Sequence, residues 1–352
     1  MKAMILELLR RKGDFVSGQE LCELNNVSRT AVWKAIRSLE KEGYKIEAVR
    51  NRGYRLIEDE PSGDPDNALD IYSANEIKSR LTEASGIREV VFFDSIDSTN
   101  SECSRRAEAG CDGGLLVVSD DQSAGRGRRG RTWDSPPGSN IYFSVMIRPD
   151  IAPSSAPQLT ILMALAVCRG MEKVLTGSAY KAGNRKSSPA RHPAAPLIKW
   201  PNDIVIDGKK VCGMLTEMSS EADYIRYVVV GVGINVRHRD FPEEISKTAI
   251  SLEDAWEKKV KRSVLTAEIV NEFGELLKIF EEEGDLSYFR GMYLDRLVNA
   301  GRKVRVLDPG GEYEALARGI NERGELLVET EDGTVKEVNS GEVSVRGIYG
   351  YV

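Results

Sequence analysis

Arginine and glycine are concentrated in residues 121–140, DQSAGRGRRGRTWDSPPGSN, which follow an apolar run typical of a strand. A guanidinium group binds phosphate through paired hydrogen bonds, and glycine lets a loop stay open when empty and close over a ligand. The spacing therefore predicts a flexible cationic loop that binds phosphate groups. An exposed basic loop without a ligand, or one that contacts nucleic acid, is the alternative. The four arginines of the segment are Arg126, Arg128, Arg129 and Arg131.

The glycine spacing GRGRRG, residues 125–130, also matches the phosphate loop of a dinucleotide-binding fold. That fold needs a helix directly after the glycines. Residues 134–137, DSPP, disfavour a helix there because of their two prolines. We therefore expect no Rossmann-type site.

A second group of polar residues lies around Lys199 and Trp200, at the end of an expected strand. The lysine suits a carboxylate or a phosphate, and Asn202 and Asp203 suit a nucleotide or Mg²⁺. Residues 94–100, DSIDSTN, offer hydroxyl and amide groups to a neutral polar head such as a ureido ring.

The segment GVGIN, residues 231–235, carries two glycines inside an apolar run. Glycine in a strand allows a ligand or another chain to approach the backbone closely. We expect such an approach at Gly231 and Gly233.

Imidazole and thiol groups are few: the histidines are His192 and His238, and the five cysteines form no CxxC pair. We therefore expect no structural metal site, no disulfide framework and no Ser-His-Asp arrangement. Free thiols are typical of the reducing cytosol. Apolar stretches are too short to cross a bilayer and the N-terminus has no apolar signal core, so we expect a cytoplasmic protein without a membrane partner.

Strand-like runs alternate with helical patterns from residue 71 to about residue 295, which predicts an α+β domain with a mixed sheet. Helices are expected over about 157–175 and 264–283. The dipeptide at 207–208, Asp-Gly, predicts a tight hairpin between two antiparallel strands, because glycine accepts a positive φ. The expected strands are VVFF, LLVVS, NIYFSVMI, LIKW, IVI and YVVVGVGINV.

Residues 1–62 predict a winged helix-turn-helix DNA-binding domain of three helices and a hairpin. Ser17 and Glu20 form a capping box for the second helix, and Ser28 can cap the third. The hairpin would bring Arg50 and Arg52 to phosphates, whereas a helical interaction module with a solvated basic face is the alternative. The outward face of the third helix suits a major groove and carries Arg29, Thr30, Trp33, Lys34 and Arg37.

The length of 352 residues fits two or three domains. The composition, 41% hydrophobic and 30% charged, is typical of soluble globular proteins. Residues 1–57 carry twelve Lys or Arg against seven Asp or Glu, although the whole chain has a net charge of −6. Residues 58–70 predict a linker and residues 177–196 a mobile surface excursion. Residues 296–352 predict a small SH3-like β-barrel, from short strands separated by glycine turns.

Taken together, DSTN, QSAGRGRRGRTW, KWPND with the downstream CGMLTE, and GVGIN resemble the catalytic domain of biotin protein ligases, in the family's order. The winged helix and C-terminal barrel are similar to those of the bifunctional class, biotin--[acetyl-CoA-carboxylase] ligases that also repress the biotin operon. The resemblance covers nearly the whole chain, and implies a central domain, 71–295, similar to class II aminoacyl-tRNA synthetases. The excursion at 177–196 departs from it.

The resemblance implies that the protein forms biotinyl-5′-AMP from biotin and ATP with Mg²⁺ and transfers biotin to a lysine of the biotin carboxyl carrier protein of acetyl-CoA carboxylase. It also implies operator DNA and a ligand-promoted homodimer. Lys199, Arg126 and Arg128 would be catalytic, and Arg129, Arg131 and Asp203 are further nucleotide candidates. The implied ligand-binding residues are Ser98, Thr99, Asn100, Gln122, Gly125, Arg126, Gly127, Arg128, Lys199, Trp133, Asn202 and Asn235.

Three alternatives stay open at this point. Trp133 would pack on adenine or belong to the core. The protein would be a biotin-sensing repressor without ligase turnover, or a lipoate ligase, which shares the general fold.

Overall fold

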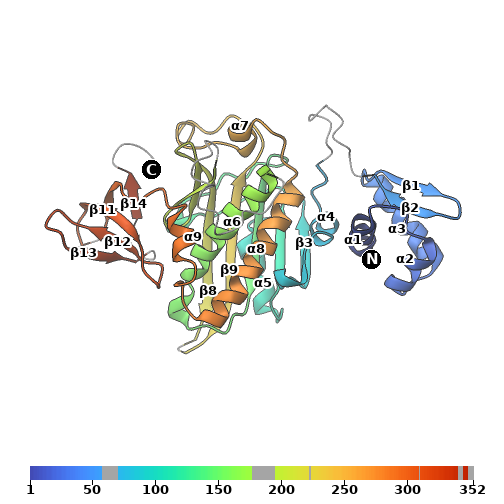
Figure 1. Cartoon of the computed structure of the whole chain (residues 1–352), viewed down its shortest axis with the longest axis horizontal. Helices are drawn as coiled ribbons and strands as arrows, with labels where there is room; N and C mark the ends of the chain where they lie inside the picture. The colour runs from blue at the N-terminus through green and yellow to red at the C-terminus, as the bar shows by residue number, and fades with distance from the viewer. Residues whose placement is uncertain (58–69, 177–194, 222, 309, 340–343, 348–352) are drawn as a thin grey trace.

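The computed structural model describes residues 1–57, 70–176, 195–221, 223–308, 310–339 and 344–347. Residues 58–69 of the predicted linker and 177–194 of the predicted excursion lie outside the described residues. Figure 1 shows an N-terminal domain at one end of the molecule, a large central domain, and a small β domain at the other end.

Three helices and a hairpin make up the N-terminal domain, as predicted, with Ile5, Leu6 and Leu39 fully buried in a core of its own. Ser17 and Ser28 cap the second and third helices by accepting hydrogen bonds from backbone N–H groups. The elements are α1 (Lys2–Lys12), α2 (Gly18–Asn25), α3 (Arg29–Lys41), β1 (Ile46–Val49) and β2 (Gly53–Leu56).

The central domain is built on a seven-stranded mixed sheet of order β3-β4-β5-β9-β8-β7-β6, which confirms the predicted α+β class. Only β3 and β4 are parallel, and the other neighbours are antiparallel. The strands are β3 (Glu89–Phe93), β4 (Leu115–Ser119), β5 (Asn140–Ile147), β6 (Leu197–Lys199), β7 (Asp203–Ile206), β8 (Lys209–Ser220) and β9 (Ile225–Asn235).

The predicted hairpin at Asp207-Gly208 joins β7 to β8, and both residues have a positive φ, 49° and 74°. The two long predicted helices are α6 (Gln158–Thr176) and α8 (Arg262–Glu283). The shorter elements of the domain are α4 (Ala74–Lys78), η2 (Glu83–Ser85), α5 (Thr99–Glu108), η3 (Arg128–Gly130), η4 (Pro153–Ser155), α7 (Leu252–Trp256) and α9 (Arg290–Leu294).

Helices cover both faces of the sheet. On one face, α6 and α8 lie side by side over the strands and form the main core with them (Figure 1). On the other face, Cys103 and Ala107 of α5 pack on Leu115, Val117 and other strand side chains. Because side chains alternate along a strand, β9 presents Val228 and Val230 to the main core and Tyr227 and Val229 to the side of α5. The first turn of α5 is therefore set directly against the sheet.

The C-terminal domain is a five-stranded antiparallel sheet of order β13-β12-β11-β10-β14. Its buried side chains belong to the same apolar cluster as the central sheet. Trp200 is central to this junction: its indole N–H donates to Gly324 O at 3.0 Å and its backbone N–H to Asn299 Oδ1 at 2.9 Å. The strands are β10 (Lys303–Leu307), β11 (Tyr313–Ile320), β12 (Leu326–Glu329), β13 (Val335–Val338) and β14 (Ser344–Gly347).

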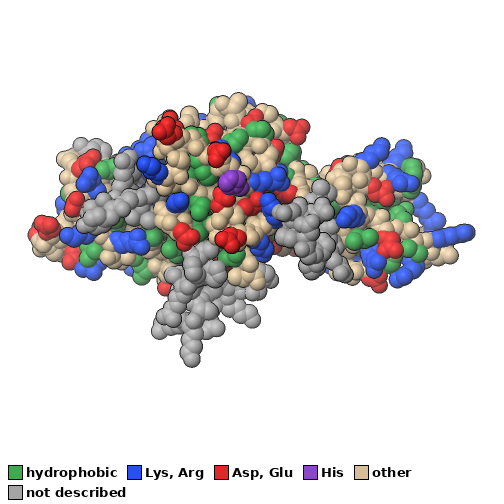
Figure 2. Space-filling model, turned by 90° about the horizontal axis from the view of Figure 1, so that it is seen from above, with side chains coloured by type: hydrophobic (Ala, Val, Ile, Leu, Met, Phe, Trp, Pro, Cys, Tyr) green, Lys and Arg blue, Asp and Glu red, His purple; other side chains and the backbone are tan. Residues whose placement is uncertain are grey.

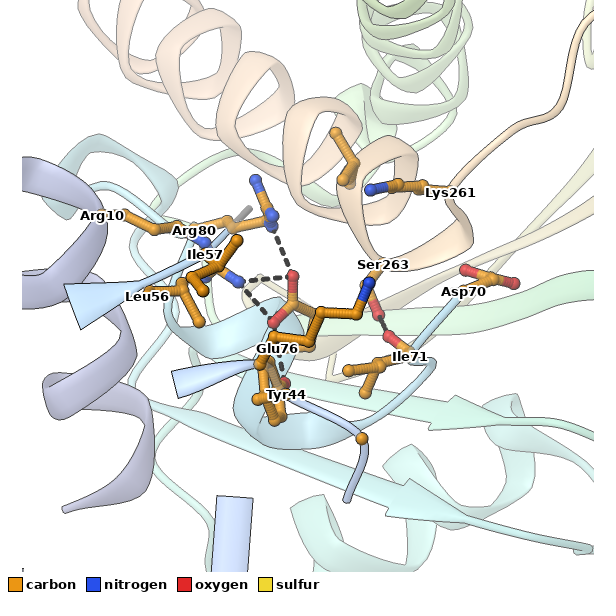
Figure 3. A pocket seen from close by; sticks show the side chains of 13 residues that line it. Arg10, Tyr44, Leu56, Ile57, Asp70, Ile71, Glu76, Arg80, Lys261 and Ser263 are labelled. Atoms are coloured by element: carbon orange, nitrogen blue, oxygen red, sulfur yellow. Dashed lines mark hydrogen bonds and ion pairs between the residues drawn. The ribbon is translucent and has the colours of Figure 1, made fainter. Parts of the chain in front are cut away.

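A buried carboxylate joins the N-terminal domain to the central domain. Glu76 of α4, 6% exposed, accepts two hydrogen bonds from Arg10 of α1, one from the Tyr44 hydroxyl and one from Arg80 (Figure 3). Burial alone would raise the pKa of Glu76, but the two guanidinium groups and the Tyr44 hydrogen bond lower it overall. The contact fixes α1 against α4.

Candidate functional site

A polar pocket lies between the first turn of α5 and the glycine-containing stretches of β8 and β9. Ser98, Thr99 and Asn100 enter it from α5 and are at most 4% exposed. Gln122 enters from the segment after β4. Arg126 enters from residues 125–131, called the arginine loop below. With Asn202, which also lines the pocket, the structure brings together predicted residues that lie up to 104 positions apart in the sequence.

Hydrogen bonds fix the floor of the polar pocket. Gln122 Oε1 accepts from the Thr99 backbone N–H at 2.9 Å, and its Nε2 donates to Ser135 Oγ at 3.0 Å. Ser144 of β5, fully buried, has its Oγ 2.8 Å from Thr99 Oγ1 and 2.6 Å from Asn100 Oδ1. Because these groups already hold one another in place, they present a preformed set of donors and acceptors.

The arginine loop is a short hairpin in this structure. The Gly127 N–H donates to Arg131 O at 2.7 Å, and the Trp133 N–H donates to Gly125 O at 2.9 Å. Gly125 is required by sterics, since a Cβ atom there would lie 2.4 Å from Trp133 O. The loop turns through Arg129, with φ of 57°, and leads into β5, so the helix that a Rossmann-type loop needs does not follow the glycines.

Trp133 forms a wall of the pocket rather than part of the core. A Cβ atom on Gly233 would lie 2.5 Å from its indole, and one on Gly213 would lie 2.9 Å from it. The Lys210 ammonium lies 5.2 Å from the indole ring centroid. The indole Nε1 is buried and has no hydrogen-bond partner within the described residues.

The two glycines of GVGIN make room for side chains of the same chain. Gly233 accommodates Trp133, and a Cβ atom on Gly231 would lie only 2.0 Å from Asn100 Oδ1. We expected a ligand or another chain to approach the backbone here. In the structure Asn100 and Trp133 make these approaches, and both glycines also line the polar pocket, so contact with a ligand there stays a prediction.

A second, cationic cavity adjoins the polar pocket and shares Arg128, Trp133 and Asn202 with it. Its volume of about 590 Å³ is in the range of small-molecule sites. Arg128 Nη1 donates to Asn202 Oδ1 at 2.9 Å, and Lys210 forms an ion pair of 2.5 Å with Asp203. The cavity is lined by more cations than anions, namely Arg128, Arg129, Arg131, Lys199 and Lys210 against Asp203 and Glu244.

Burial lowers the pKa of Arg128, and the neighbouring Arg129 and Arg131 lower it further, against an opposing effect of Asp203. The lowered pKa means that the cation is less stable here than in water. An anion bound in the cavity would remove this penalty. The electrostatics therefore favour a phosphate or carboxylate ligand.

Lys199 is buried, 7% exposed, at the end of β6 and lines the cationic cavity but not the polar pocket. The adjacent Trp200 is held by Asn299 and Gly324, so the C-terminal domain fixes the strand end that carries the lysine. Asn235, the last residue of β9, lines neither cavity and pairs with Asn140 in the sheet. Gly125 is the other predicted ligand-binding residue that lines neither cavity.

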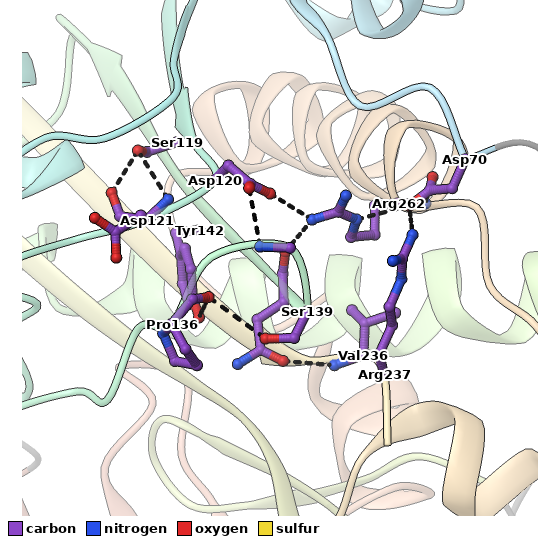
Figure 4. Close-up of polar contacts among 12 residues, drawn as sticks. Asp70, Ser119, Asp120, Asp121, Pro136, Ser139, Tyr142, Val236, Arg237 and Arg262 are labelled. Carbon is purple, nitrogen blue, oxygen red and sulfur yellow. Dashed lines mark hydrogen bonds and ion pairs between the residues drawn. The ribbon is translucent and has the colours of Figure 1, made fainter. Parts of the chain in front are cut away.

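An ionic network holds the segment that leads out of the arginine loop (Figure 4). Asp120 accepts from the Gly138 N–H at 2.9 Å and from Arg262 Nη1 at 2.6 Å. Arg262 also donates to Asp70 at 2.7 Å, and Arg237 donates to the same carboxylate at 2.8 Å. The network connects β4, β9 and α8, and the sequence offered no local pattern that indicated it.

All five predicted DNA-facing side chains of α3, from Arg29 to Arg37, are exposed, and Trp33 is 51% exposed. Figure 2 shows Lys and Arg side chains gathered over the N-terminal domain, at the right end of the view. Arg52 of the hairpin turn stacks over the Phe15 ring at 4.2 Å from its centroid. The hairpin therefore adds a cationic group of its own to the N-terminal domain.

Within the described ranges, no group of three His, Cys, Asp or Glu side chains could hold a metal ion. The helices of those ranges are also too short or too polar to span a membrane.

Comparison with known proteins places these features in one family. The model of the biotin/lipoate A/B protein ligase family matches residues 92–235, an HTH domain model matches 2–55, and the model of the biotin protein ligase C-terminal domain matches 300–346. The chain is 37% identical to the bifunctional ligase/repressor BirA of Bacillus spizizenii over 345 residues, 97% of either chain. The chain belongs to the bifunctional ligase/repressor family.

A second member, BirA of Escherichia coli, is 31% identical over 96% of this chain and 95% of its own. Among solved structures, the biotin protein ligase of Aquifex aeolicus in complex with biotin and ATP superposes with a TM-score of 0.61 and 30% identity. It covers 74% of this chain and all of its own. The fold and three-part organisation expected for this family are therefore confirmed.

Sequence reasoning missed three residues that complete the site: Ser144, Lys210 and Glu217. Each lies on a strand and reaches the site through contacts between distant segments. Glu217 belongs to the CGMLTE motif and Lys210 follows the hairpin turn, so their proximity to the motifs was the available signal. Ser144 stands inside an apolar run, where a buried hydroxyl group needs a hydrogen-bond partner.

Proposed function

We propose that this chain is an ATP-dependent biotin protein ligase that also represses transcription of biotin synthesis genes. The observation that carries the proposal is a polar pocket continuous with a cationic cavity, with Arg128, Trp133 and Asn202 lining both. This arrangement suits two substrates that react with one another, one with a neutral polar head and one with phosphates. It agrees with membership of the ligase/repressor family.

In the first step, a carboxylate oxygen of biotin attacks the α-phosphorus of ATP, and pyrophosphate leaves. Ser98, Thr99, Asn100 and Gln122 bind the biotin head. Negative charge accumulates on the phosphate oxygens in this step. Arg128 and its neighbours on the loop, with Lys199, stabilise that charge by preorganised electrostatics.

In the second step, the amine of an acceptor lysine attacks the acyl carbon of biotinyl-5′-AMP, and AMP leaves. The acceptor proposed is the biotin carboxyl carrier protein of acetyl-CoA carboxylase. The enzyme needs no nucleophile of its own for this step, because the mixed anhydride is already activated. Trp133 is the aromatic side chain placed to stack on adenine.

Mg²⁺ would enter with ATP, since this ion keeps several waters and is commonly held by substrate phosphates with one or two carboxylates. Asp203 and Glu244 are the carboxylates that line the cationic cavity, and Asp203 is the one proposed here for this role because it follows Asn202 in the KWPND motif. It is paired with Lys210, so the ion would share it.

The repressor activity rests on α3, whose exposed basic face fits a major groove. Binding of a two-fold-symmetric operator requires a homodimer. We propose that biotinyl-5′-AMP promotes the dimer by ordering the arginine loop. A cytoplasmic location is part of the proposal, since the proposed acceptor and operator would be met there.

The test measures release of pyrophosphate by the purified protein with ATP, Mg²⁺ and biotin, and traps biotinyl-5′-AMP by chromatography. Lipoate at equal concentration is the control substrate. We expect pyrophosphate with biotin and much less with lipoate. A protein that binds biotin without releasing pyrophosphate is a sensor without turnover, and a preference for lipoate identifies a lipoate ligase.

A further inference from the structure

The Glu217 carboxylate connects the two halves of the polar pocket. Its Oε2 accepts from Asn100 Nδ2 at 2.7 Å and from Arg126 Nη2 at 2.7 Å. Asn100 belongs to the buried first turn of α5, and Arg126 to the arginine loop, whereas Glu217 lies on β8. One carboxylate oxygen thus ties a rigid element to the loop.

Asn100 is held on every side in this arrangement. Its Oδ1 lies 2.6 Å from Ser144 Oγ, and its Nδ2 donates to Leu215 O at 3.3 Å as well as to Glu217. Gly231 leaves the space that the amide occupies. Loss of the carboxylate would remove the shorter of the two hydrogen bonds made by Nδ2 and leave the amide free to turn.

Arg126 also depends on Glu217, through an ion pair that water partly screens. The side chains of both residues are partly exposed, at 44% and 34%, and Arg126 stands between two glycines, where the backbone resists little. A long side chain on such a backbone loses considerable conformational entropy when it is ordered. The ion pair supplies that order before any ligand arrives.

We propose that Glu217 is a positioning residue of the ligase site, which preorganises Asn100 and Arg126 around the bound biotin. The inference rests on the proposed function. Glu217 does not line the polar pocket itself and acts through the two residues that do. Preorganisation matters because a small misplacement of a charged group reduces the rate of a reaction that depends on electrostatic stabilisation.

The experiment compares Glu217→Ala and Glu217→Gln with the wild-type full-length protein, in steady-state assays of biotin-dependent pyrophosphate release. Glu108→Gln is the matched control, since Glu108 of α5 forms a 2.8 Å ion pair with Arg226 of β9 outside both cavities. Glu217 connects α5 and the arginine loop to the central sheet, and Glu108 connects α5 to the same sheet through Arg226. Thermal unfolding of each variant is recorded alongside.

We expect Glu217→Ala to lower kcat/KM for biotin by about 10-fold to 100-fold, with a fall in kcat and a rise in KM, since hydrogen bonds to charged groups are among the stronger ones. Glu217→Gln keeps one carbonyl acceptor, so its kcat/KM for biotin should lie between those of Glu217→Ala and the wild type. Glu108→Gln should keep wild-type kinetics. In the Arg126→Ala background, Glu217→Ala should cause a smaller loss than in the wild type, because part of its effect passes through Arg126.

Wild-type kinetics in Glu217→Ala overturn the inference while the proposed function stands. So does a lower KM for biotin in Glu217→Gln, which would mean that the carboxylate competes with the ligand for Arg126. A wild-type protein that releases no pyrophosphate overturns the proposed function and this inference with it.

Discussion

The contact between the DNA-binding and central domains depends on Glu76, and its removal gives the most quantitative test of the architecture. The Glu76 side chain is 8% exposed, and those of its partners Arg10 and Arg80 are 14% and 24% exposed. Glu76→Ala leaves both guanidinium groups and the Tyr44 hydroxyl without this acceptor. Removal of one partner from a buried ion pair typically costs about 3 to 5 kcal/mol.

A matched exposed pair in the same N-terminal domain sets the comparison. Glu47 pairs with Arg55 at 2.7 Å, with side chains 37% and 42% exposed. Glu47→Ala should cost about 1 kcal/mol or less, because water screens such a pair. The difference between the two variants measures the combined effect of burial and of the two additional donors to Glu76, the Tyr44 hydroxyl and the Arg80 guanidinium.

The assay is urea unfolding of the full chain, followed by circular dichroism and by tryptophan fluorescence. Trp33 is the one tryptophan of residues 1–57, whereas Trp133, Trp200 and Trp256 report on the rest of the chain. The Glu76→Ala transition should move to lower urea, while Glu47→Ala stays near wild type. Equal stability of the two variants would refute the reasoning that burial makes this contact strong.

The pH dependence of the same contact follows from its lowered pKa. The pKa of Glu76 lies below its ordinary 4.5 in the folded protein, so the ionised carboxylate stabilises the fold fully above pH 4.5. This contribution is lost as the pH falls through the folded-state pKa. The stability gap between wild type and Glu76→Gln should therefore be constant near neutral pH and narrow in acid, and a gap that widens in acid would give the wrong sign.

Three further predictions concern the site and the DNA-binding face. Lys199→Ala or Arg128→Ala should reduce biotin-dependent pyrophosphate release by about 100-fold to 1000-fold, with unchanged circular dichroism, because each removes a preorganised cation; turnover at the wild-type rate argues against these roles. Gly231→Ala places a Cβ atom 2.0 Å from Asn100 Oδ1 and should raise KM for biotin at least about tenfold, whereas Gly291→Ala, with no atom within 4 Å, should not. Lys34→Ala should weaken operator binding in gel shifts and reduce the steepness of log K against log salt by about 0.9 per subunit, or about 1.8 for the proposed homodimer, and an unchanged slope would show that Lys34 contacts no phosphate.

The parts of the fold that local pattern determines could be predicted from the sequence. The hairpin at Asp207-Gly208 follows from the positive φ that a tight turn requires, and both residues adopt it. Ser17 and Ser28 cap their helices as their spacing indicates. The sequence also allowed several residues of the polar pocket to be predicted. Ser98 to Asn100, Gln122 and Arg126 belong to separate recognisable motifs, and all of them line the pocket.

The remainder depends on contacts between distant segments, which periodicity does not encode. Gly231 and Gly233 signalled a close approach, but the sequence did not tell that Asn100 and Trp133 are what approaches. Ser144 and Glu217 contact Asn100 from two different strands, 44 and 117 positions away in the chain. A buried hydroxyl or carboxylate can only be assigned once the partner across the sheet is known.

The sequence also did not predict that the central and C-terminal domains share one apolar core. The glycine-rich turns of residues 296–352 predicted a separate small barrel, and its antiparallel strands are present. Trp200, however, bonds to both Asn299 and Gly324, so the end of the strand that carries Lys199 is completed by residues about a hundred positions later. The apolar pattern of a strand predicts which of its side chains face inward, but it does not predict which segment of the chain packs against them.

The central claim is that the polar pocket and the cationic cavity together activate biotin for transfer to a protein lysine. Mass spectrometry of a biotin carboxyl carrier domain, after incubation with the purified protein, ATP, Mg²⁺ and biotin, tests it most directly. We expect one biotin per carrier domain, attached to a lysine, no modification without ATP, and modification slowed by about 100-fold to 1000-fold with Lys199→Ala. A carrier domain that keeps its unmodified mass after complete incubation with the wild-type protein would contradict the account.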